Sequence, residues 1–551
     1  MALKRVGNTI IAAALPAVMI GCTVGPNYKP PAVKTNATFS AKQPATQAAP
    51  DPAAVSLERW WESFNDPVLD SLIDRALRTN IDLRIAQSRV REARAQLIIQ
   101  QAAIYPNLNA DGSYERLRLS KEGFYLPGGG GGRPATLSGG GVNPSGAGTL
   151  NHVSPSMRRR PAAAGTGAGA GGTSTSNGLE SAFTKTEIDT FQGGFDASWE
   201  LDIFGGVRRS IEAAVADEQS MVESRRDTMI SLLSEVARNY VQLRGVQREL
   251  AIAYENIRSQ QDTVDLTMSR FRAGLTTDLD VARAEAQVAT TRATVPGSLT
   301  TLNQAVHRIA VLLGQSPTAL EAELLRKQAP IPAGPPTVPV GIPSELLRRR
   351  PDVRRAERQL AGATARVGAA TADLFPRFSL TGSLGLASGS FRNLGRLDSV
   401  YYTIGPSISW PIFDAGRIRA NIRVQNEREN QAAAQYEAVV LTSLEDVENA
   451  IVAYSQEQAR HHDLQAAVDA DRRAVTLAEQ LYQKGLTDFL NVLDAQRNLF
   501  ASEDNLVQSE TSLSADVVAL YKALGGGWED LETPPGMQMN SQDGIVNTAN
   551  Q

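Results

Sequence analysis

One segment without helix-breaking residues sets the scale of this chain. Residues 207–272 contain no proline and only one glycine, Gly245, so little in them interrupts a helix. Because a helix rises about 1.5 Å per residue, the segment predicts a single helix of about 100 Å. That length is about three times the hydrocarbon core of a bilayer. We therefore expect the helix to project far beyond any membrane that the chain enters.

Apolar side chains recur along this segment at alternating steps of four and three residues. The positions hold, in order, Val236, Tyr240, Leu243, Gln247, Leu250, Tyr254, Ile257, Gln261, Val264, Met268 and Phe271. A mean period of 3.5 residues is typical of helices that pack in a left-handed coiled coil. A second long helix is expected from about Arg417 to Lys484, with a looser seam of Val447, Ile451, Tyr454, Val468, Val475 and Tyr482.

The chain contains two copies of one plan. The stretch around Gly274 matches the stretch around Gly485 at a constant offset of 211 positions. The stretch that begins at Asp82 matches the one that begins at Asp352, but here the offset is 270 positions. Matches of this kind predict an internal duplication. Because the two offsets differ by 59 residues, the first copy is expected to contain an insertion of that length.

The insertion must lie between Pro106 and Trp199, and composition locates it. Residues 121–180 hold 17 of the 45 glycines in the chain. Such a segment has too little apolar surface to offset the entropy lost on ordering, so we expect a loop at about 117–186. A phosphate-binding loop is disfavoured, because no Gly-Lys-Ser/Thr sequence follows the glycines.

Four stretches alternate apolar or small residues with polar ones at a period of two, which is typical of strands. They comprise Leu108, Ala110, Gly112 and Tyr114; Phe191, Gly193, Phe195, Ala197, Trp199 and Leu201; Phe378, Leu380, Gly382, Leu384 and Leu386; and Tyr402, Ile404, Pro406, Ile408, Trp410 and Ile412. A tilted membrane strand requires about ten residues. We therefore expect four membrane strands, arranged as two hairpins.

Four strands are too few to close a membrane barrel, since the smallest have about eight. The edge of an open sheet cannot face lipid, because its backbone groups would lack hydrogen-bond partners. The chain is therefore expected to form oligomers, and three copies would supply 12 strands, enough for an open lumen. The helices and the glycine-rich insertion would then lie on opposite sides of the membrane.

The two matched turns have the residues of one helix end followed by the next helix start. Gly485 suits the left-handed conformation just after a helix. Thr487 is a good N-cap, and Asp488 would lie in the following first turn, where the helix dipole favours an anion. The same plan surrounds Gly274 and Thr276. Each copy is thus expected to form a helical hairpin.

The N-terminus has the layout of a secretory signal. Basic residues precede an apolar run at 10–20 that is too short to span a bilayer. Residues 19–22 resemble a bacterial lipobox, in which the cysteine becomes the acylated first residue of the mature protein. We therefore expect a signal peptide at 1–21 and lipidation at Cys22. Thr23, in place of an aspartate, favours the outer membrane.

Composition disfavours several classes of function. The formal net charge of -4 and the pI near 5.8 provide no basic field for nucleic acid, so no nucleic acid partner is expected. Four histidines and one cysteine leave little material for a metal site, so no metal and no cofactor are expected. An enzyme is disfavoured too, because no nucleophile motif is present and Asp278 with Asp280 fits a helix N-terminus.

Five motifs, taken together, are specific. They are CTVGPNYKPP from Cys22, RWWESFNDPVLDSLIDRAL from Arg59, WELDIFGGVRR from Trp199, LLGQSP from Leu312 and GIPSELLRRRPDVRRAE from Gly341. The chain, from Cys22 to about Gly527, resembles the outer membrane factor family of TolC-like channels. Within that family it is most similar to the lipoprotein branch of NodT and OprM type, which serves resistance-nodulation-division efflux pumps.

The resemblance implies an α+β membrane protein with an internal duplication. It implies a homotrimer whose four strands per protomer form a 12-stranded transmembrane β-barrel, continued by a long periplasmic 12-helix α-barrel with an equatorial domain. The expected location is the outer membrane of a Gram-negative bacterium, in contact with its lipid. The expected partners are a periplasmic membrane fusion (adaptor) protein and an inner membrane resistance-nodulation-division pump. The expected function is the passive, gated exit channel of a tripartite multidrug or toxic-compound efflux system.

The resemblance also implies a periplasmic gate at Leu490, Asp494 and Arg497, on the helix after the second turn. Their spacing of i, i+4 and i+7 places all three on one helical face. The alternative is an exposed Asp494–Arg497 ion pair of little energetic value. The residues implied to contact the adaptor at the tip are Leu275, Thr276, Leu486 and Thr487.

The resulting domain plan has six parts. They are a signal peptide at 1–21, a lipidated N-terminal equatorial segment at 22–68, a first repeat at 69–327, a proline-rich equatorial link at 328–343, a second repeat at 344–527 and a C-terminal tail at 528–551. Two other functions remain open at this stage. They are an outer membrane channel for protein secretion, which would share the fold, and a periplasmic coiled-coil scaffold lipoprotein.

Overall fold

The computed structural model describes most of the chain and divides it into two units. The described residues are 23–31, 57–118, 187–326, 329–335, 338, 343 and 348–529. The helical unit comprises Met1–Pro106, Trp199–Ser379 and Ser407–Gln551, and the strand unit comprises Asn107–Ser198 and Leu380–Pro406. The predicted signal peptide, the Cys22 lipidation site, nearly all of the glycine-rich insertion, parts of the proline-rich link and nearly all of the C-terminal tail lie outside the described residues.

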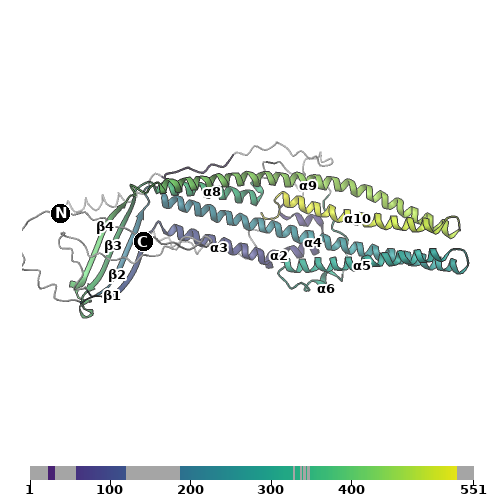
Figure 1. The fold of residues 1–551 in the computed structure, drawn as a ribbon, viewed down its shortest axis with the longest axis horizontal. Helices are drawn as coiled ribbons and strands as arrows, with labels where there is room; N and C mark the ends of the chain where they lie inside the picture. Colours follow the sequence, from purple (N-terminus) through teal and green to yellow (C-terminus); the bar gives the residue numbers. More distant parts are fainter. Residues whose placement is uncertain are drawn as a thin grey trace, which may run out of the picture. The chain divides into compact units, whose positions relative to one another are not determined.

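Long helices make up the helical unit (Figure 1). Its elements are η1 (Leu57–Phe64), α2 (Pro67–Thr79), α3 (Ile81–Ala102), α4 (Gly206–Arg272), α5 (Asp278–Leu312), α6 (Glu321–Leu324), α8 (Pro351–Ala372), α9 (Arg417–Gln483) and α10 (Phe489–Ala523). The two predicted long helices are confirmed within one residue, and α4 and α9 each have 67 residues. The helices that follow the two turns, α5 and α10, are equal in length as well, with 35 residues each.

The apolar seam predicted along α4 is only partly correct. Val236, Tyr240 and Leu243 are fully buried, but Tyr254 is 51% exposed and Phe271 is 39% exposed. The helix packs against α3 and α8 near its start and against α5 and α10 farther along. Because its neighbours change, no single 3.5-residue repeat describes the buried face along the whole helix. The seam predicted along α9 is confirmed, because all six of its residues are buried.

The four predicted strands are present and form one sheet. They are β1 (Asn107–Arg118), β2 (Glu187–Leu201), β3 (Arg377–Ser388) and β4 (Val400–Ser409), in the spatial order β1-β2-β3-β4. Strands β1 and β2 are antiparallel, with Tyr114 opposite Phe191. The short 3-10 turns η2 (Phe391–Asn393) and η3 (Leu397–Ser399) lie between β3 and β4. Long helices with a small sheet are thus confirmed, whereas the trimer, the barrels and the duplication stay predictions.

Strand β4 is shorter than predicted. It ends at Ser409, so Trp410 and Ile412 lie beyond it. Pro411 has no N–H to donate to a strand ladder, although Pro406 lies within this edge strand. The indole Nε1 of Trp410 donates instead to the carbonyl oxygen of Leu374, at 3.0 Å.

The register between β1 and β2 separates two faces of the sheet. On one face Leu108, Ala110 and Tyr114 lie opposite Ala197, Phe195 and Phe191. On the other face Asn109 and Ser113 lie opposite Asp196 and Gln192. Large apolar side chains of the sheet are exposed, including Leu108 and Phe195 as well as Tyr402 and Ile404 of β4. The sheet therefore has an apolar face that the described chain leaves uncovered.

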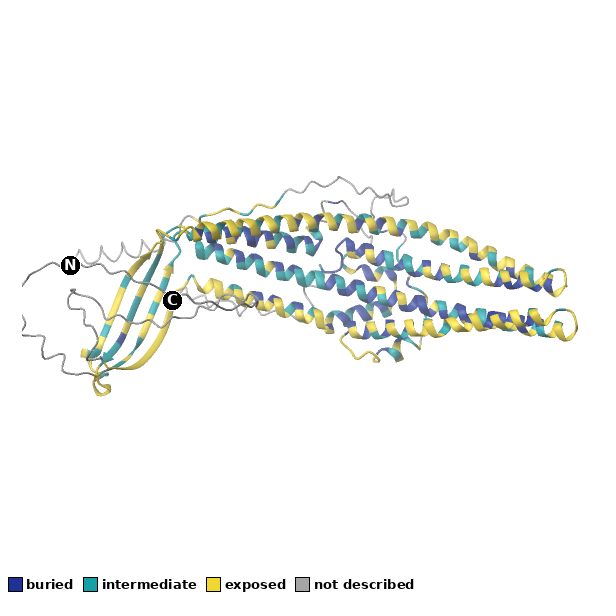
Figure 2. Cartoon of the chain, viewed as in Figure 1, coloured by how far each residue is buried: buried dark blue, intermediate teal, exposed yellow. Residues whose placement is uncertain are grey.

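The main apolar core lies in the helical unit, where η1 and α2 pack against α4 and α10 (Figure 2). Trp60 stacks on Tyr521 with ring centroids 5.3 Å apart. A buried polar chain crosses this core: the hydroxyl of Tyr240 donates to Asp66 at 2.7 Å, and Arg244 donates to that hydroxyl at 3.0 Å. None of the described helices is both long enough and apolar enough to cross a membrane.

Asp516 of α10 provides a pH-dependent test of this packing. Burial, and then the nearby Glu457, raise its pKa from 3.8 to about 6. The folded state therefore binds more protons than the unfolded state between these values, and stability falls as the pH rises through the window. We expect Asp516→Asn to stabilise the protein by about 1 kcal/mol at pH 7.5, after a discount for solvent screening. Thermal melting followed by circular dichroism should show the gain at pH 7.5 and little of it at pH 4; an equal gain at both would contradict this reading.

Candidate functional site

Two helical hairpins end in equivalent turns, which lie side by side at one end of the helical unit (Figure 1). Gly274 joins α4 to α5 and Gly485 joins α9 to α10, both with φ of 72°. In the first turn the amide of Leu275 donates to the carbonyl of Arg270 at 2.9 Å, and in the second Leu486 donates to Leu481 at 2.9 Å. This backbone pattern closes a helix end and requires a left-handed residue, so both predicted glycine turns are confirmed.

The predicted N-cap in the second turn is wrong by one residue. The N-cap of α10 is Asp488, with φ of -81° and ψ of 155°, and the helix begins at Phe489. The hydroxyl of Thr487 accepts a hydrogen bond from the side-chain amide of Asn491 instead, at 2.6 Å. The glycine turn is followed by two residues outside both helices, Leu486 and Thr487, which delays the helix start. Asp488 is therefore outside the first turn.

The first turn has a carboxylate that holds two threonines. Thr276 and Thr277 donate their hydroxyl protons to Asp280, at 2.6 and 3.1 Å. Burial would raise the pKa of Asp280, but these hydrogen bonds outweigh burial and the pKa lies below its usual value. Asp280 therefore stays ionised and stabilises the start of α5.

The three residues of the predicted gate lie on one exposed face of α10. Leu490 is 54% exposed, and Asp494 and Arg497 are exposed as well. The Nε of Arg497 donates to the side-chain oxygen of Gln287 on α5, at 2.7 Å. Asp494 forms no hydrogen bond or ion pair with the described residues, so the alternative of an Asp494–Arg497 pair is not seen in this chain. The role of this face as a gate remains a prediction.

The predicted adaptor-contacting residues lie at the two turns. Leu275 is 66% exposed and Leu486 is 71% exposed, whereas Thr276 and Thr487 are half-buried. Figure 2 shows both turns as exposed ends of the hairpins. Each turn therefore exposes a large apolar side chain to solvent, and contact with an adaptor stays a prediction.

A small apolar cluster lies just above the turns and joins the two hairpins. This tip cluster consists of Val264, Ala284, Val288, Tyr482, Phe489, Val492 and Leu493. The rings of Tyr482 and Phe489 are 5.6 Å apart. Because the cluster takes residues from both hairpins, it fixes the face that carries Leu490 relative to α4 and α5.

Sequence reasoning missed the polar contacts between the hairpins. Gln496 donates to the hydroxyl of Thr263 on α4 at 2.9 Å and to Glu479 on α9 at 3.0 Å. Arg270, in the last turn of α4, donates to the carbonyl of Tyr482 at 3.0 Å. The position of Arg270 near a helix C-terminus, where the helix dipole favours a cation, was the only sequence signal that could have indicated this contact. Nothing local in the sequence identifies its acceptor.

The N-terminal segment follows the predicted lipidation site and is anchored firmly. Arg209 of α4 is only 4% exposed and donates to the carbonyl of Val24 at 3.2 Å and to the side chain of Asn27 at 2.6 Å. Gly25 has φ of +89°, and a Cβ there would lie 2.4 Å from the Cα of Gly368. Only glycine allows this backbone contact.

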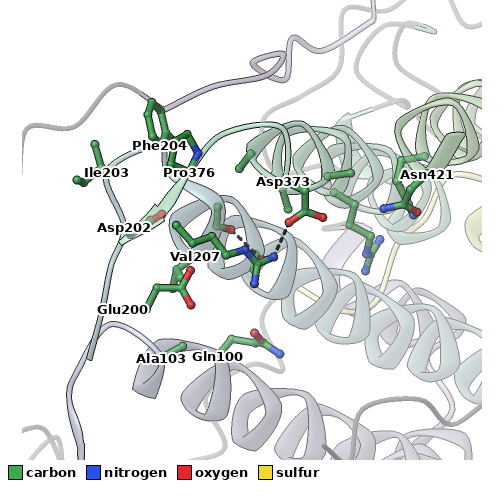
Figure 3. Close-up of a pocket in the computed structure, with 18 of the residues that line it drawn as sticks. Gln100, Ala103, Glu200, Asp202, Ile203, Phe204, Val207, Asp373, Pro376 and Asn421 are labelled. Carbon is green, nitrogen blue, oxygen red and sulfur yellow. Dashed lines mark hydrogen bonds and ion pairs between the residues drawn. The ribbon is translucent and has the colours of Figure 1, made fainter. Parts of the chain in front are cut away.

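A cavity of about 480 Å³ lies within the helical unit (Figure 3). Its charged lining residues are Glu200, Asp202, Arg366, Asp373, Arg377 and Arg428. Arg377 pairs with Asp373 at 2.5 Å, and Asp202 pairs with Arg208. Among the described residues, no group of histidine, cysteine and acidic side chains is suited to a metal ion. Its lining carries acidic and basic side chains in equal number, so the cavity does not indicate a particular ligand.

Comparisons with known proteins agree on one family. A sequence model of the family described as outer membrane efflux protein matches residues 165–315 and 342–526. Nodulation protein T of Rhizobium leguminosarum bv. trifolii is 30% identical, over 93% of this chain and 96% of the relative. The toluene efflux pump outer membrane protein TtgI of Pseudomonas putida is 31% identical, over 92% and 96%. Outer membrane protein OprJ of Pseudomonas aeruginosa is 30% identical, over 94% and 96%.

Solved structures give the same result. The outer-membrane channel OprN superimposes with a TM-score of 0.75 at 35% identity, covering 92% of this chain and 100% of OprN. The open state of the MtrE outer membrane channel of Neisseria gonorrhoeae gives a TM-score of 0.70 at 26% identity, covering 92% of this chain and 99% of MtrE.

Proposed function

The chain belongs to the outer membrane efflux protein family, and on that premise we propose that it is the outer membrane exit channel of a tripartite efflux system. Its location is the outer membrane, as for its relatives. The channel is a passive conduit for toxic compounds. A periplasmic adaptor protein and an inner membrane resistance-nodulation-division pump dock on it and open it.

The open edges and exposed apolar side chains of the sheet are the observation that supports this proposal. Among the described strands, β1 pairs only with β2 and β4 only with β3, so the sheet has two open edges. Its exposed apolar side chains suit lipid, but open edges in lipid cost several kcal/mol for each unpaired backbone group. Pairing β1 of one copy with β4 of the next removes both edges. Three copies then close a 12-stranded barrel with an open lumen.

The remaining parts of the domain plan follow from this assembly. The periplasmic α-barrel is a wall of 12 helices, four from each copy. The equatorial domain is formed by η1, α2, α6 and the link at 328–343. Residues 1–21 are removed as a signal peptide, and lipid on Cys22 anchors the segment that Arg209 holds. The insertion at about 117–186 lies outside the cell, and the chain from 69 to 527 consists of two structural repeats.

The hairpin turns form the periplasmic mouth. Leu490, Asp494 and Arg497 face the axis and close it, so that three copies of Asp494 form a ring of carboxylates. Arginine contacts must offset the repulsion in that ring. The adaptor docks on the exposed turns, where Leu275 and Leu486 supply apolar surface.

The purified protein tests this function directly. Before heating, it should migrate in detergent gels as a trimer of the 59.0 kDa chain, and it should show β signal in purified outer membranes. In a planar bilayer it should open rarely, and a deletion strain should become sensitive to toxic compounds. Normal resistance with loss of a secreted protein would favour the secretion channel. A protein that stays monomeric and never conducts would favour the scaffold lipoprotein.

A further inference from the structure

We propose that the loop at 389–399, between β3 and β4, binds the phosphate groups of lipid in the outer leaflet of the membrane through Arg392 and Arg396. The inference rests on the proposed function, because an outer membrane channel with periplasmic helices places this loop at the cell surface. It adds a ligand to a part of the strand unit that conduction does not use.

The loop lies at the end of the sheet that is not joined to helices (Figure 1). The chain enters β1 from α3 and leaves β4 toward α9, so Asn107 and Ser409 are at the helix end of their strands. The opposite ends of the four strands are Arg118, Glu187, Ser388 and Val400. A membrane strand crosses from one side of the bilayer to the other. Because the helices are periplasmic in the proposed channel, the loop emerges on the outer side.

The apolar face of the sheet changes in character toward this end. From the helix end, β1 places Leu108, Ala110 and Tyr114 on that face, and then Arg116 and Arg118. Their partners on β2 are, in the same order, Ala197, Phe195, Phe191, Asp189 and Glu187. An order of apolar, aromatic and charged side chains is typical of a membrane strand that passes from hydrocarbon through the aromatic girdle into the headgroups. The charged pairs therefore mark the depth of the lipid headgroups.

Phe391 connects the loop to this depth. Its ring centroid is 5.8 Å from that of Phe191, and the ring of Phe191 is 4.7 Å from that of Tyr114. Phe191 is on the apolar face, so Phe391 lies beside the outer end of the face that lipid would cover. Arg392 follows directly in the chain and is exposed. The loop thus begins at the aromatic girdle and continues toward the headgroups.

The largest apolar side chains of the loop are exposed, and each has an arginine beside it in the chain. Phe391 is 73% exposed and precedes Arg392, whereas Leu397 is 90% exposed and follows Arg396. Apolar side chains of this size are unfavourable in water. An apolar residue beside a cation suits the boundary between acyl chains and headgroups. The loop therefore fits a lipid surface better than it fits water.

The two loop arginines are available for a ligand. Neither the side chain of Arg392 nor that of Arg396 forms a hydrogen bond or an ion pair with the described residues. On β1, by contrast, Arg116 is paired with Glu187 at 2.5 Å. The loop has two arginines and one acidic residue, Asp398, so its net charge is +1. A guanidinium binds a phosphate group through two parallel N–H donors, and clusters of arginine recognise lipid phosphates in this way.

The loop is held in shape by its own hydrogen bonds. The amide of Asn393 donates to the carbonyl of Ser390, and the amide of Arg396 donates to the carbonyl of Asn393, both at 3.1 Å. The hydroxyl of Ser399 donates to the carbonyl of Asn393 at 2.8 Å. Arg392 is in η2, and Arg396 directly precedes η3. A loop that is already folded loses little conformational entropy when it binds a ligand.

Binding of phosphorylated lipid to the full-length protein tests the proposal. Purified protein in detergent micelles is titrated with diphosphorylated lipid A, and in parallel with the same lipid after enzymatic removal of its phosphates. We expect the wild type to bind the phosphorylated form at least about tenfold more tightly, because a hydrogen bond to a charged group is worth about that factor. The double variant Arg392→Gln with Arg396→Gln should lose this preference. The preference of the wild type should also fall as the salt concentration rises.

The matched control is Arg258→Gln with Arg272→Gln. Both arginines are on α4, exposed and without a hydrogen bond or ion pair to the described residues. The net charge changes equally while the loop stays intact, so the control should keep the preference. Leu397→Ser keeps both loop arginines and should weaken binding of the two lipid forms by the same factor. Trimer migration and circular dichroism melts will check that each variant is folded.

Four outcomes overturn the proposal. If the wild type binds both lipid forms equally, phosphate is not recognised. If the loop double variant keeps the preference, phosphate binds elsewhere on the protein. If the control loses the preference equally, net charge is responsible rather than the loop. If inorganic phosphate binds as tightly as the lipid, the loop is a site for free anions.

Conductance of the same preparations in a planar bilayer separates this proposal from the proposed function. A protein that conducts but has no preference for phosphorylated lipid remains a channel and lacks the lipid site. A protein that has the preference and loses it in the loop double variant, but never conducts, keeps the lipid site and loses the proposed function.

Discussion

The double variant Asp494→Ala with Arg497→Ala is expected to conduct about a hundredfold more often than the wild-type channel. In the proposed channel each substitution removes one charged contact that keeps the mouth closed, and a hydrogen bond to a charged group is worth about tenfold in an equilibrium. Arg497 contributes its bond to Gln287, at 2.7 Å, which ties α10 to α5. The expected result is a large rise in open probability.

The contribution of Asp494 has to come from another copy of the chain. Its carboxylate is exposed and forms no hydrogen bond or ion pair with the described residues of its own chain. It lies on the same face of α10 as Arg497, so a three-fold axis near this face would bring it close to an arginine of the neighbouring protomer. Exposed charges are screened by salt, and the open probability of the wild type should therefore rise with ionic strength.

A matched double variant in the same turn provides the control. Lys484→Ala with Asp488→Ala removes one base and one acid that are exposed. Both precede α10 and are not among the predicted gate residues. Both proteins are recorded in the same bilayer at the same salt concentration. If the two double variants conduct equally, or if neither differs from a wild type that conducts, the gate lies elsewhere in the channel.

The long helices and glycine turns could be predicted because their signals are local. A proline-free run fixes α4 within one residue, and a glycine at a helix end fixes Gly274 and Gly485 in the left-handed conformation. The four strands could be predicted equally well, because an alternation with a period of two is visible in the local sequence without knowledge of distant neighbours. The resemblance, not the spacing, identified Leu490, Asp494 and Arg497 as a gate, and that role stays a proposal. The spacing establishes only that the three residues share one face of α10.

Features that depend on distant partners could not be predicted. The α4 seam fails at Tyr254 because the helix changes neighbours along its length, and Gln260 is buried where the pattern expects no seam residue. Arg270 reads as an ordinary basic residue near a helix end, although its acceptors are 212 and 213 positions away. The three consecutive arginines at 348–350 present the same difficulty, since the sequence does not show which one is buried.

The structure shows that it is Arg350, and Arg350→Ala is expected to lower the free energy of unfolding by about 3–5 kcal/mol. The guanidinium donates to both carboxylate oxygens of Asp352, at 3.0 and 2.7 Å, and to Asp446 at 3.0 Å. It also donates to the carbonyl of Ala523 at 2.9 Å, at the end of α10. One side chain thus joins the start of α8 to α9 and α10. Its removal leaves Asp446 and the carbonyl of Ala523 without this donor, and leaves Asp352 with the backbone amide of Val353.

Neighbouring arginines supply the comparison that makes this prediction specific. Arg348 is exposed and forms no hydrogen bond or ion pair with the described residues, so Arg348→Ala should change stability by less than about 0.5 kcal/mol. Arg350→Lys should fall between the two alanine variants, because an ammonium keeps the charge but cannot form the bidentate contact with Asp352. Denaturant melts followed by circular dichroism will rank the three variants. Equal losses for Arg348→Ala and Arg350→Ala would show that α8, α9 and α10 are held together by apolar packing alone, whereas the predicted order would locate that junction at a single guanidinium.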